Sequence, residues 1–329
     1  MAKIRVGIPG ALMYYLYFPL WQTFFNELGI DVVTSGRTTK ELLDHGVREA
    51  LADACVPIKV FFGHVMALKD KVDFLFIPRV VCLNRLTVYC PKFLGLPDMI
   101  RHSLPGLPPI IDERMDVRTG RTALFGAYRH IGSCLGCNLV QVARSLSRAR
   151  RVQGRYHRLL QDGCLPREAM ASPRNAPMSH GQVPDLTFGV LGYPYAVYDD
   201  FLNAGLLEKL HRLKVKVLTA DNVPPKRLAG QSYGLPKRLF WTFSDQVLRA
   251  AHCLFEEGKV DGIIHVSVFG CGPDSITDKM MELKAKLHRG IPFMTVMIDE
   301  HTGEAGLTTR LEAFTDMVRR RKEAAPCLK

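Results

Sequence analysis

VDFLFI at residues 72–77 and VDGIIH at residues 260–265 are the two stretches that decide the fold. Each is a short apolar run that opens with Val-Asp, and each follows a segment with a helical pattern. Short apolar strands that alternate with helices are typical of βαβ units, whose parallel sheets are buried on both faces. The sequence therefore predicts an α/β fold in which one kind of unit occurs twice.

The segments that flank the two stretches also correspond, although the repeat is weak. A predicted strand, helix and strand precede each stretch: residues 3–9, 18–28 and 30–34 in the first half, and residues 186–192, 200–213 and 214–219 in the second. After each stretch, an apolar strand ends in Asp-Glu, at residues 109–113 and 293–300. We therefore predict two tandem Rossmann-like open parallel-sheet domains.

The region between the halves separates these two domains. Residues 122–161 predict one or two helices with soft points at Gly132 and Gly136, and the following segment is rich in Pro, Ser, Asn and Gly. We predict an N-terminal α/β domain with a helical extension over residues 1–161, a linker over residues 162–185 and a C-terminal α/β domain over residues 186–329.

Length and composition bound the class of protein. The chain has 329 residues, of which 47% are hydrophobic, which is enough for two domain cores. The first residues predict a strand rather than a secretion signal, and the most apolar stretch, residues 11–25, is interrupted by Pro19 and Gln22 and is too short to cross a bilayer. We expect a cytoplasmic protein without a membrane segment, in which cysteines are ligands or core residues more often than disulfides.

The chain is basic, with a formal net charge of +12. One source is a run of arginines over residues 144–158, which favours a solvated helix face. The alternative is a surface for an acidic partner or for the phosphates of a nucleotide-like ligand. We do not expect nucleic acid as a partner, because no recognised binding motif accompanies the charge.

Three cysteines occur in the same setting, after an apolar segment and just before a proline. They are Cys55 in CVP, Cys90 in CP and Cys271 in CGP. Proline suits the first turn of a helix, so each cysteine is predicted at a helix N-terminus, where free N–H groups favour a metal-binding thiolate. The alternative is three small core residues. If the two domains face each other, all three thiols could line one crevice beyond the carboxyl ends of the strands.

Other cysteines give weaker signals. Cys134 and Cys137 form a Cys-x-x-Cys pair, which on a helix would place both sulfurs on one face, as additional ligands, a redox dithiol or core residues. Cys82 lies on or just after the strand that precedes Cys90 and could lie near the crevice. Three thiolates are too few for a structural zinc site, but a [4Fe–4S] cluster with three cysteines keeps one iron open for another ligand.

Other motifs of known chemistry are missing from the sequence. It has no His-Glu-x-x-His, no Gly-x-Ser-x-Gly, no phosphate-binding Gly-x-x-x-x-Gly-Lys-Ser/Thr loop and no Gly-x-Gly-x-x-Gly after the first strand. Glu300 and His301 follow Asp299 and could form an acid–base cluster. His64 follows Cys55 by about two helical turns, where a satisfied core histidine is favoured over a group that supports a ligand.

Five segments carry a resemblance to a known family. They are DACVPIK (53–59), VDFLFIPR (72–79), CPKFLGLPD (90–98), FGCGPDS (269–275) and IDEHTGEAG (298–306). They resemble the 2-hydroxyacyl-CoA dehydratases and their activators, in the branch described as CoA-substrate activase-related, a domain of unknown function. The segments span most of the chain.

The resemblance implies an oxygen-sensitive iron–sulfur protein with Rossmann-like domains, in which Cys55, Cys90 and Cys271 bind a [4Fe–4S] cluster. In the wider superfamily a separate ATP-hydrolysing activator injects a single electron at very low potential. Some relatives hold a double-cubane cluster and reduce small molecules. A double cubane would need further cysteines, for which Cys82, Cys134 and Cys137 are the candidates.

We therefore expect a cluster-binding subunit of an ATP-driven low-potential reductase or 2-hydroxyacyl-CoA dehydratase-like system. Its substrate would be an acyl-CoA or a small molecule, and Glu300 or His301 would move protons. The sequence leaves open whether the chain is part of a lyase or a reductase, or a non-catalytic electron-transfer or scaffold subunit beside a sister cluster subunit. A third interpretation is a zinc-stabilised or metal-free α/β binding protein.

Overall fold

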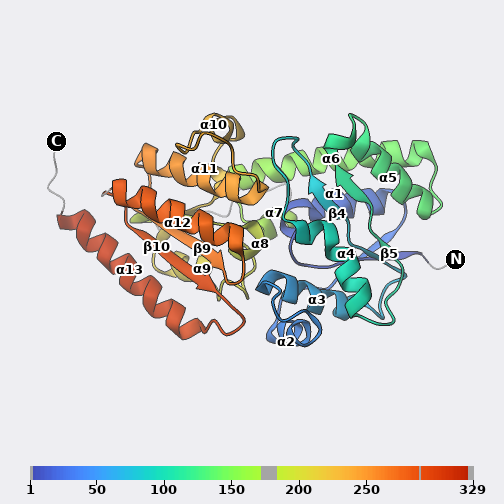
Figure 1. Cartoon of the computed structure of the whole chain (residues 1–329), viewed down its shortest axis with the longest axis horizontal. Coiled ribbons are helices and arrows are strands. Elements are labelled where there is room, and N and C mark those ends of the chain that lie inside the picture. Colours follow the sequence, from blue (N-terminus) through green and yellow to red (C-terminus); the bar gives the residue numbers. More distant parts are fainter. Residues whose placement is uncertain (1–2, 172–183, 289, 325–329) are drawn as a thin grey trace. The chain divides into compact units, whose positions relative to one another are not determined.

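The computed structural model describes residues 3–171, 184–288 and 290–324, and it is an α/β protein built from parallel sheets (Figure 1). The described chain divides into two compact units. Unit 1 contains residues 3–158, 166–171 and 239–242, and unit 2 contains the remainder. In the described residues all strand pairs are parallel, which confirms the predicted fold class.

Unit 1 is built around a four-stranded sheet with the order β2-β1-β3-β5, beside a two-stranded sheet of β4 and β6. Its strands are β1 (Arg5–Ile8), β2 (Asp31–Thr34), β3 (Phe74–Phe76), β4 (Arg79–Cys82), β5 (Ile110–Ile111) and β6 (Arg114–Asp116). Its helices are α1 (Tyr14–Glu27), α2 (Lys40–Glu49), α3 (Val56–Leu68), α4 (Pro91–Ser103), α5 (Ala123–Cys134), most of α6 (Leu139–Gln161) and α7 (Pro166–Ala171).

Unit 2 is built around a four-stranded sheet with the order β10-β9-β7-β8. Its strands are β7 (Leu186–Gly192), β8 (Val215–Leu218), β9 (Gly262–Val268) and β10 (Phe293–Ile298). Its helices are α8 (Pro194–Val197), α9 (Leu206–Arg212), α10 (Pro225–Gly230), nearly all of α11 (Thr242–Glu257), α12 (Gly272–Leu287) and α13 (Glu304–Ala324).

The two four-stranded sheets have the same topology. In each, the first strand of the unit lies between the second and the third, which places a switch in strand order beside the first strand. The Val-Asp motif makes the same contacts in both units. Asp73 exchanges two hydrogen bonds with the backbone of Arg5, and Asp261 exchanges the equivalent pair with Thr187. The correspondence of the halves therefore extends to individual side chains.

Helix α1 begins at Tyr14, ahead of the predicted start at residue 18, and it continues through Pro19. Proline lacks the N–H that would bond to the carbonyl of Tyr15, and its ring strains the neighbouring bonds. Side chains of α6 take these places: the Tyr156 hydroxyl donates to the Tyr15 carbonyl at 2.6 Å, and Gln153 donates to the Leu16 carbonyl at 2.6 Å while accepting from the Leu20 N–H at 3.2 Å. The helix persists because a second helix satisfies the groups that proline leaves open.

Helices α2 and α3 approach so closely that their backbones touch through two glycines. A Cβ atom on Gly63 would lie 1.9 Å from the carbonyl oxygen of Leu42, and one on Gly46 would lie 1.8 Å from that of Lys59. Only hydrogen fits at either place, so these glycines fix how α3 packs.

Some predicted elements differ from the observed ones. The helix predicted at residues 200–213 begins only at Leu206. The Asp199 side chain accepts from the Leu202 N–H before the helix, the Asn203 side chain accepts from the N–H of Leu206 itself, and Gly205 has a left-handed φ of 72°. The helical region 122–161 forms two helices, with Gly136 in the left-handed region between them. Helix α7 lies inside the predicted linker, and residues 172–183 lie outside the described part of the chain.

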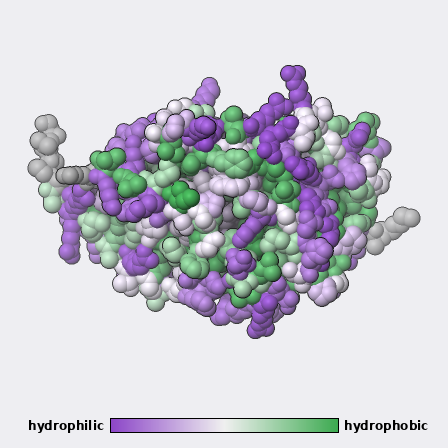
Figure 2. Space-filling model, viewed as in Figure 1, coloured by the Kyte–Doolittle hydropathy of each residue, from purple (hydrophilic) through white to green (hydrophobic). Residues whose placement is uncertain are grey.

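Hydrophilic and hydrophobic residues are interspersed over the face seen in Figure 2. Among the described helices, none combines the length and the apolar character needed to cross a bilayer.

Candidate functional site

Cys55 and Cys90 both lie at helix N-termini in unit 1, as predicted. Cys55 is the N-cap residue of α3 and Cys90 is that of α4, and each helix has a proline in its first turn. A helix that leads into a parallel strand starts at the carboxyl edge of the sheet, and α3 precedes β3 while α4 precedes β5. Both thiols therefore lie at the edge where open α/β sheets bind ligands.

The two thiols are close enough to influence each other. Burial raises the pKa of the half-buried Cys90 thiol, the Lys92 backbone N–H that bonds to it acts in the opposite direction, and the neighbouring Cys55 thiol raises this pKa further. Lys92 is the first residue of α4 with an N–H to offer, because Pro91 has none. The helix N-terminus supplies a donor to the sulfur, as predicted, while burial acts in the opposite direction and has the larger effect on this pKa.

Cys271 has the corresponding position in unit 2, as the N-cap of α12. The chain turns from β9 into this helix through Gly270, whose φ of 77° suits glycine. Asp274 in the first turn of α12 holds the turn, because its Oδ2 accepts from the Val268 N–H and from the Ser267 hydroxyl, both at 2.9 Å. Buried carboxylate bonds of this kind fix the position of Cys271 relative to the strand.

His265 on β9 lies fully buried beneath this turn, between two carboxylates of α12. Its Nδ1 is 2.7 Å from Asp278 Oδ1, which also accepts from the Thr295 hydroxyl of β10, and its Nε2 is 3.3 Å from Asp274 Oδ1. Burial lowers the pKa of His265, but the carboxylates of Asp274 and Asp278 outweigh burial and raise it to about 9. An imidazolium therefore links β9 to the helix that starts at Cys271.

This buried ion pair predicts a loss of stability at alkaline pH. A histidine whose pKa is raised on folding contributes its full stability below the unfolded value of about 6.5 and loses it as the pH rises through about 9. The expected loss of unfolding free energy is on the order of 3 kcal/mol, measured as the urea midpoint of the full chain between pH 6 and 10. His265→Gln should flatten the profile, and a wild-type midpoint that is constant over this range would refute the charged pair.

Cys82 is fully buried at the end of β4, in a cluster with Val81 and Val88. Its Sγ donates to the carbonyl of Thr87 at 3.2 Å. These contacts are those of a packed core cysteine.

Cys134 and Cys137 do not share a helix face, contrary to expectation. Helix α5 ends at Cys134, and the backbone of Cys137 folds back to bond to the Gly132 carbonyl at 2.8 Å, with Gly136 at a φ of 74°. This closure places Cys137 over Gly132, two residues from Cys134 on the helix. Cys134 instead faces His130, whose Nε2 is 4.0 Å from its Sγ and whose Nδ1 bonds to Glu113.

Glu300 and His301 lie in the turn that follows β10. Asp299 forms this turn by accepting from the His301 N–H at 2.9 Å and from the Thr302 hydroxyl at 2.9 Å. Because β9 and β10 are neighbouring parallel strands, this turn and Cys271 lie beyond the same edge of one sheet. His301 is exposed and Glu300 is half-buried.

His64 is a satisfied core histidine, the favoured interpretation. It is fully buried on α3, with Nδ1 2.7 Å from the Ser35 hydroxyl and Nε2 2.9 Å from the Thr38 hydroxyl. Burial lowers the pKa of His64 to about 4, so the ring is neutral. The Gly10 N–H donates to the Ser35 oxygen at 2.8 Å, so this hydroxyl links the ring to the residues that follow β1.

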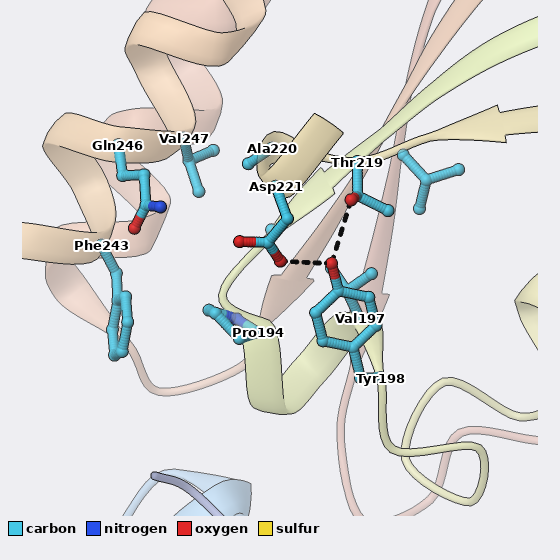
Figure 3. A pocket seen from close by; sticks show the side chains of 11 residues that line it. Pro194, Val197, Tyr198, Thr219, Ala220, Asp221, Phe243, Gln246 and Val247 are labelled. Carbon is cyan, nitrogen blue, oxygen red and sulfur yellow. Dashed lines mark hydrogen bonds between the residues drawn. The ribbon is translucent and has the colours of Figure 1, made fainter. Parts of the chain in front are cut away.

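Each unit also has a hollow at the carboxyl edge of its sheet. In unit 1 it is small and is lined by apolar and aromatic side chains, including Phe61 of α3 and Phe93 of α4. In unit 2 it is also small, and Gln246 and Asp221 line it with Tyr198, whose hydroxyl lies 2.9 Å from Thr219 Oγ1 (Figure 3). Both hollows occupy places where this topology holds ligands.

The eight cysteines that the structure describes form no disulfide with one another. Among the described residues, no three His, Cys, Asp or Glu side chains are grouped as ligands of one metal ion. The structure brings Cys55 and Cys90 together in unit 1 and places Cys271 in unit 2, so the convergence of all three stays a prediction. Thiolates are the ligands that iron–sulfur clusters use, and these three cysteines fit that donor chemistry.

Comparison with known families divides the chain in two. The family model for the CoA enzyme activase uncharacterised domain (DUF2229) matches residues 5–223, and the model for the 2-hydroxyglutaryl-CoA dehydratase D-component matches residues 208–318. Cys55 and Cys90 fall in the first match and Cys271 falls in the second. No curated protein matches the chain. Because the first match covers well over half of its residues, this chain belongs to the family of the CoA enzyme activase uncharacterised domain.

Proposed function

We propose that this chain is the iron–sulfur subunit of an ATP-driven, low-potential reductase or of a 2-hydroxyacyl-CoA dehydratase-like system. Cys55, Cys90 and Cys271 are its proposed ligands for a [4Fe–4S] cluster. A separate ATP-hydrolysing activator is the proposed electron donor, since the chain itself has no phosphate-binding loop motif.

The proximity of the Cys55 and Cys90 thiols is the observation that carries the proposal. They are 35 positions apart in sequence, yet both cap helices at one sheet edge and interact electrostatically. Two core cysteines would gain nothing from sharing this edge, whereas two ligands of one group need it. The family match to a dehydratase D-component over the segment that contains Cys271 supports the third ligand.

The cluster, when bound, would supply one-electron chemistry at low potential. The chain would stabilise the negative charge of the cluster at its cysteine ligands. The Lys92 N–H bonds to the Cys90 sulfur, and the N-termini of α3, α4 and α12 direct the positive ends of their dipoles toward the three cysteines. Binding of the group would replace the buried thiol proton of Cys90, whose pKa burial raises, with a metal–sulfur bond.

The remaining cysteines favour one three-cysteine cluster over a double cubane. The Cys82 thiol is bonded in the core, and Cys134 and Cys137 diverge where α5 ends. Glu300 and His301, beyond the same sheet edge as Cys271, are the proposed proton carriers toward an acyl-CoA or small substrate.

Metal analysis of the chain purified without oxygen tests the proposal. We expect about four iron and four sulfide per chain, with a cluster EPR signal that appears on reduction. Reduction by the activator should require ATP hydrolysis. A chain that carries zinc, or no metal after reconstitution with iron and sulfide, would contradict the proposal. A cluster that turns over no substrate with activator and ATP would indicate an electron-transfer subunit instead.

A further inference from the structure

We infer that the Tyr193 hydroxyl is a hydrogen-bond donor to the sulfur of Cys271 and thereby sets the reduction potential of the cluster that this thiolate would hold. The inference rests on the proposed function. It gives a role to a residue outside the cysteine motifs, within the described part of unit 2.

The fold places Tyr193 beside Cys271. Strands β7 and β9 are hydrogen-bonded neighbours, with Gly192 paired to Val266 at their carboxyl ends. Tyr193 follows Gly192 directly, and Cys271 follows the end of β9 by three residues. The two side chains therefore meet at one edge of the sheet, although they are 78 positions apart in sequence.

The ring of Tyr193 is held rigidly. It is 4% exposed and packs at 5.8 Å from the ring of Tyr195 and at 5.4 Å from that of Phe243, measured between centroids. Its hydroxyl oxygen lies 2.7 Å from the Ser244 hydroxyl on α11. A buried phenol fixed at both the ring and the oxygen can direct its single proton to one acceptor.

The contacts of the hydroxyl assign the donors. A thiolate ligand carries no proton, so the Cys271 sulfur can only accept from the Tyr193 hydroxyl that bonds to it. The phenol proton is then committed to the sulfur, so in the 2.7 Å bond to Ser244 the Ser244 hydroxyl is the donor. The Ser244 hydroxyl therefore donates to the Tyr193 oxygen, and the Tyr193 hydroxyl donates to the Cys271 sulfur.

Proline placement explains why Cys271 depends on a side chain. At Cys90 the second residue of the helix, Lys92, provides an N–H to the sulfur. In α12 the second residue is Pro273, which has no N–H. An N-cap side chain usually accepts from the backbone N–H of the second or third residue of its helix, and α12 lacks the first of these two donors. Tyr193 supplies a hydrogen-bond donor to Cys271 in its place.

A donor to a ligand sulfur stabilises the more negative, reduced cluster and raises its potential. Tyr193→Phe removes the donor and keeps the packed ring. The full chain is reconstituted with iron and sulfide, titrated with dithionite and followed by EPR. At a fixed potential, the ratio of reduced to oxidised cluster should fall about tenfold in the variant, which corresponds to a midpoint potential about 59 mV more negative. Ser244→Ala should shift the midpoint in the same direction by less.

Tyr198→Phe is the matched control. Tyr198 is also buried in unit 2, but its hydroxyl bonds to Thr219 and Asp221, so this variant should titrate like the wild type. An unchanged midpoint in Tyr193→Phe with full iron content, or an equal shift in Tyr198→Phe, would overturn this inference alone. A wild-type chain without iron would overturn the proposed function, and this inference with it, before any variant is made.

Discussion

Replacing any one of Cys55, Cys90 or Cys271 with alanine should remove most of the iron from the chain. After purification without oxygen, we expect about four iron per chain in the wild type and less than about one in each variant. The reason is that each substitution removes one of only three protein ligands of the cluster. Iron and sulfide analysis measures this loss, and circular dichroism should show that the secondary structure persists.

Two other cysteines provide matched controls. Cys253 is buried on α11 with its Sγ bonded to Gln231, and Cys164 is buried just before α7. Cys253→Ala and Cys164→Ala should keep full iron and the wild-type EPR signal. Full iron in Cys55→Ala, Cys90→Ala and Cys271→Ala would reject the ligand set, and retention in Cys271→Ala alone would confine the site to unit 1.

Gly63→Ala should strongly destabilise unit 1, although it adds only one methyl group. The new Cβ would lie 1.9 Å from the Leu42 carbonyl oxygen, and backbone cannot yield as a flexible side chain can, so α2 and α3 must separate. Overpacking of this kind costs about 3 kcal/mol or more, a large share of a domain's stability. The urea midpoint of the full chain measures the loss. Because α3 carries Cys55 at its N-cap, bound iron should fall too.

Gly154→Ala on α6 adds the same methyl group where it meets no described atom within 4 Å. Relief of the glycine penalty in a helix should stabilise this variant by about 0.5–1 kcal/mol. Equal urea midpoints for Gly63→Ala and Gly154→Ala would show that the close crossing of α2 and α3 does not limit the stability of unit 1.

The apolar runs made the parallel sheets predictable, because burial on both faces leaves a clear pattern at residues 72–77 and 260–265. The proline after each cysteine made the helix starts predictable, because proline suits the first turn of a helix. It does not identify a ligand, since Cys164 also precedes a prolyl helix start, at α7, and lies buried. The pattern indicates backbone geometry, and the neighbours decide the chemistry.

The neighbours of the site could not be predicted, since they come from distant segments. Nothing near Tyr193 in the sequence indicates that Ser244 and Cys271 bond to its hydroxyl. His265 lies in the VDGIIH stretch as one more strand residue, and its charge depends on carboxylates of the following helix. The shared helix face of Cys134 and Cys137 was not observed, because α5 ends at Cys134 and Gly136 is in the left-handed region after it.

The side chains that complete α1 have a consequence for the order in which the chain can fold during synthesis. Gln153 and Tyr156 leave the ribosome 133 to 141 residues after the backbone groups that they satisfy. Until then the nascent N-terminal unit carries unsatisfied carbonyls beside Pro19, in a helix that packs on its first strands. Its native state therefore waits for α6, and the segment that looks like a connector in the sequence serves as the closing element of the first unit.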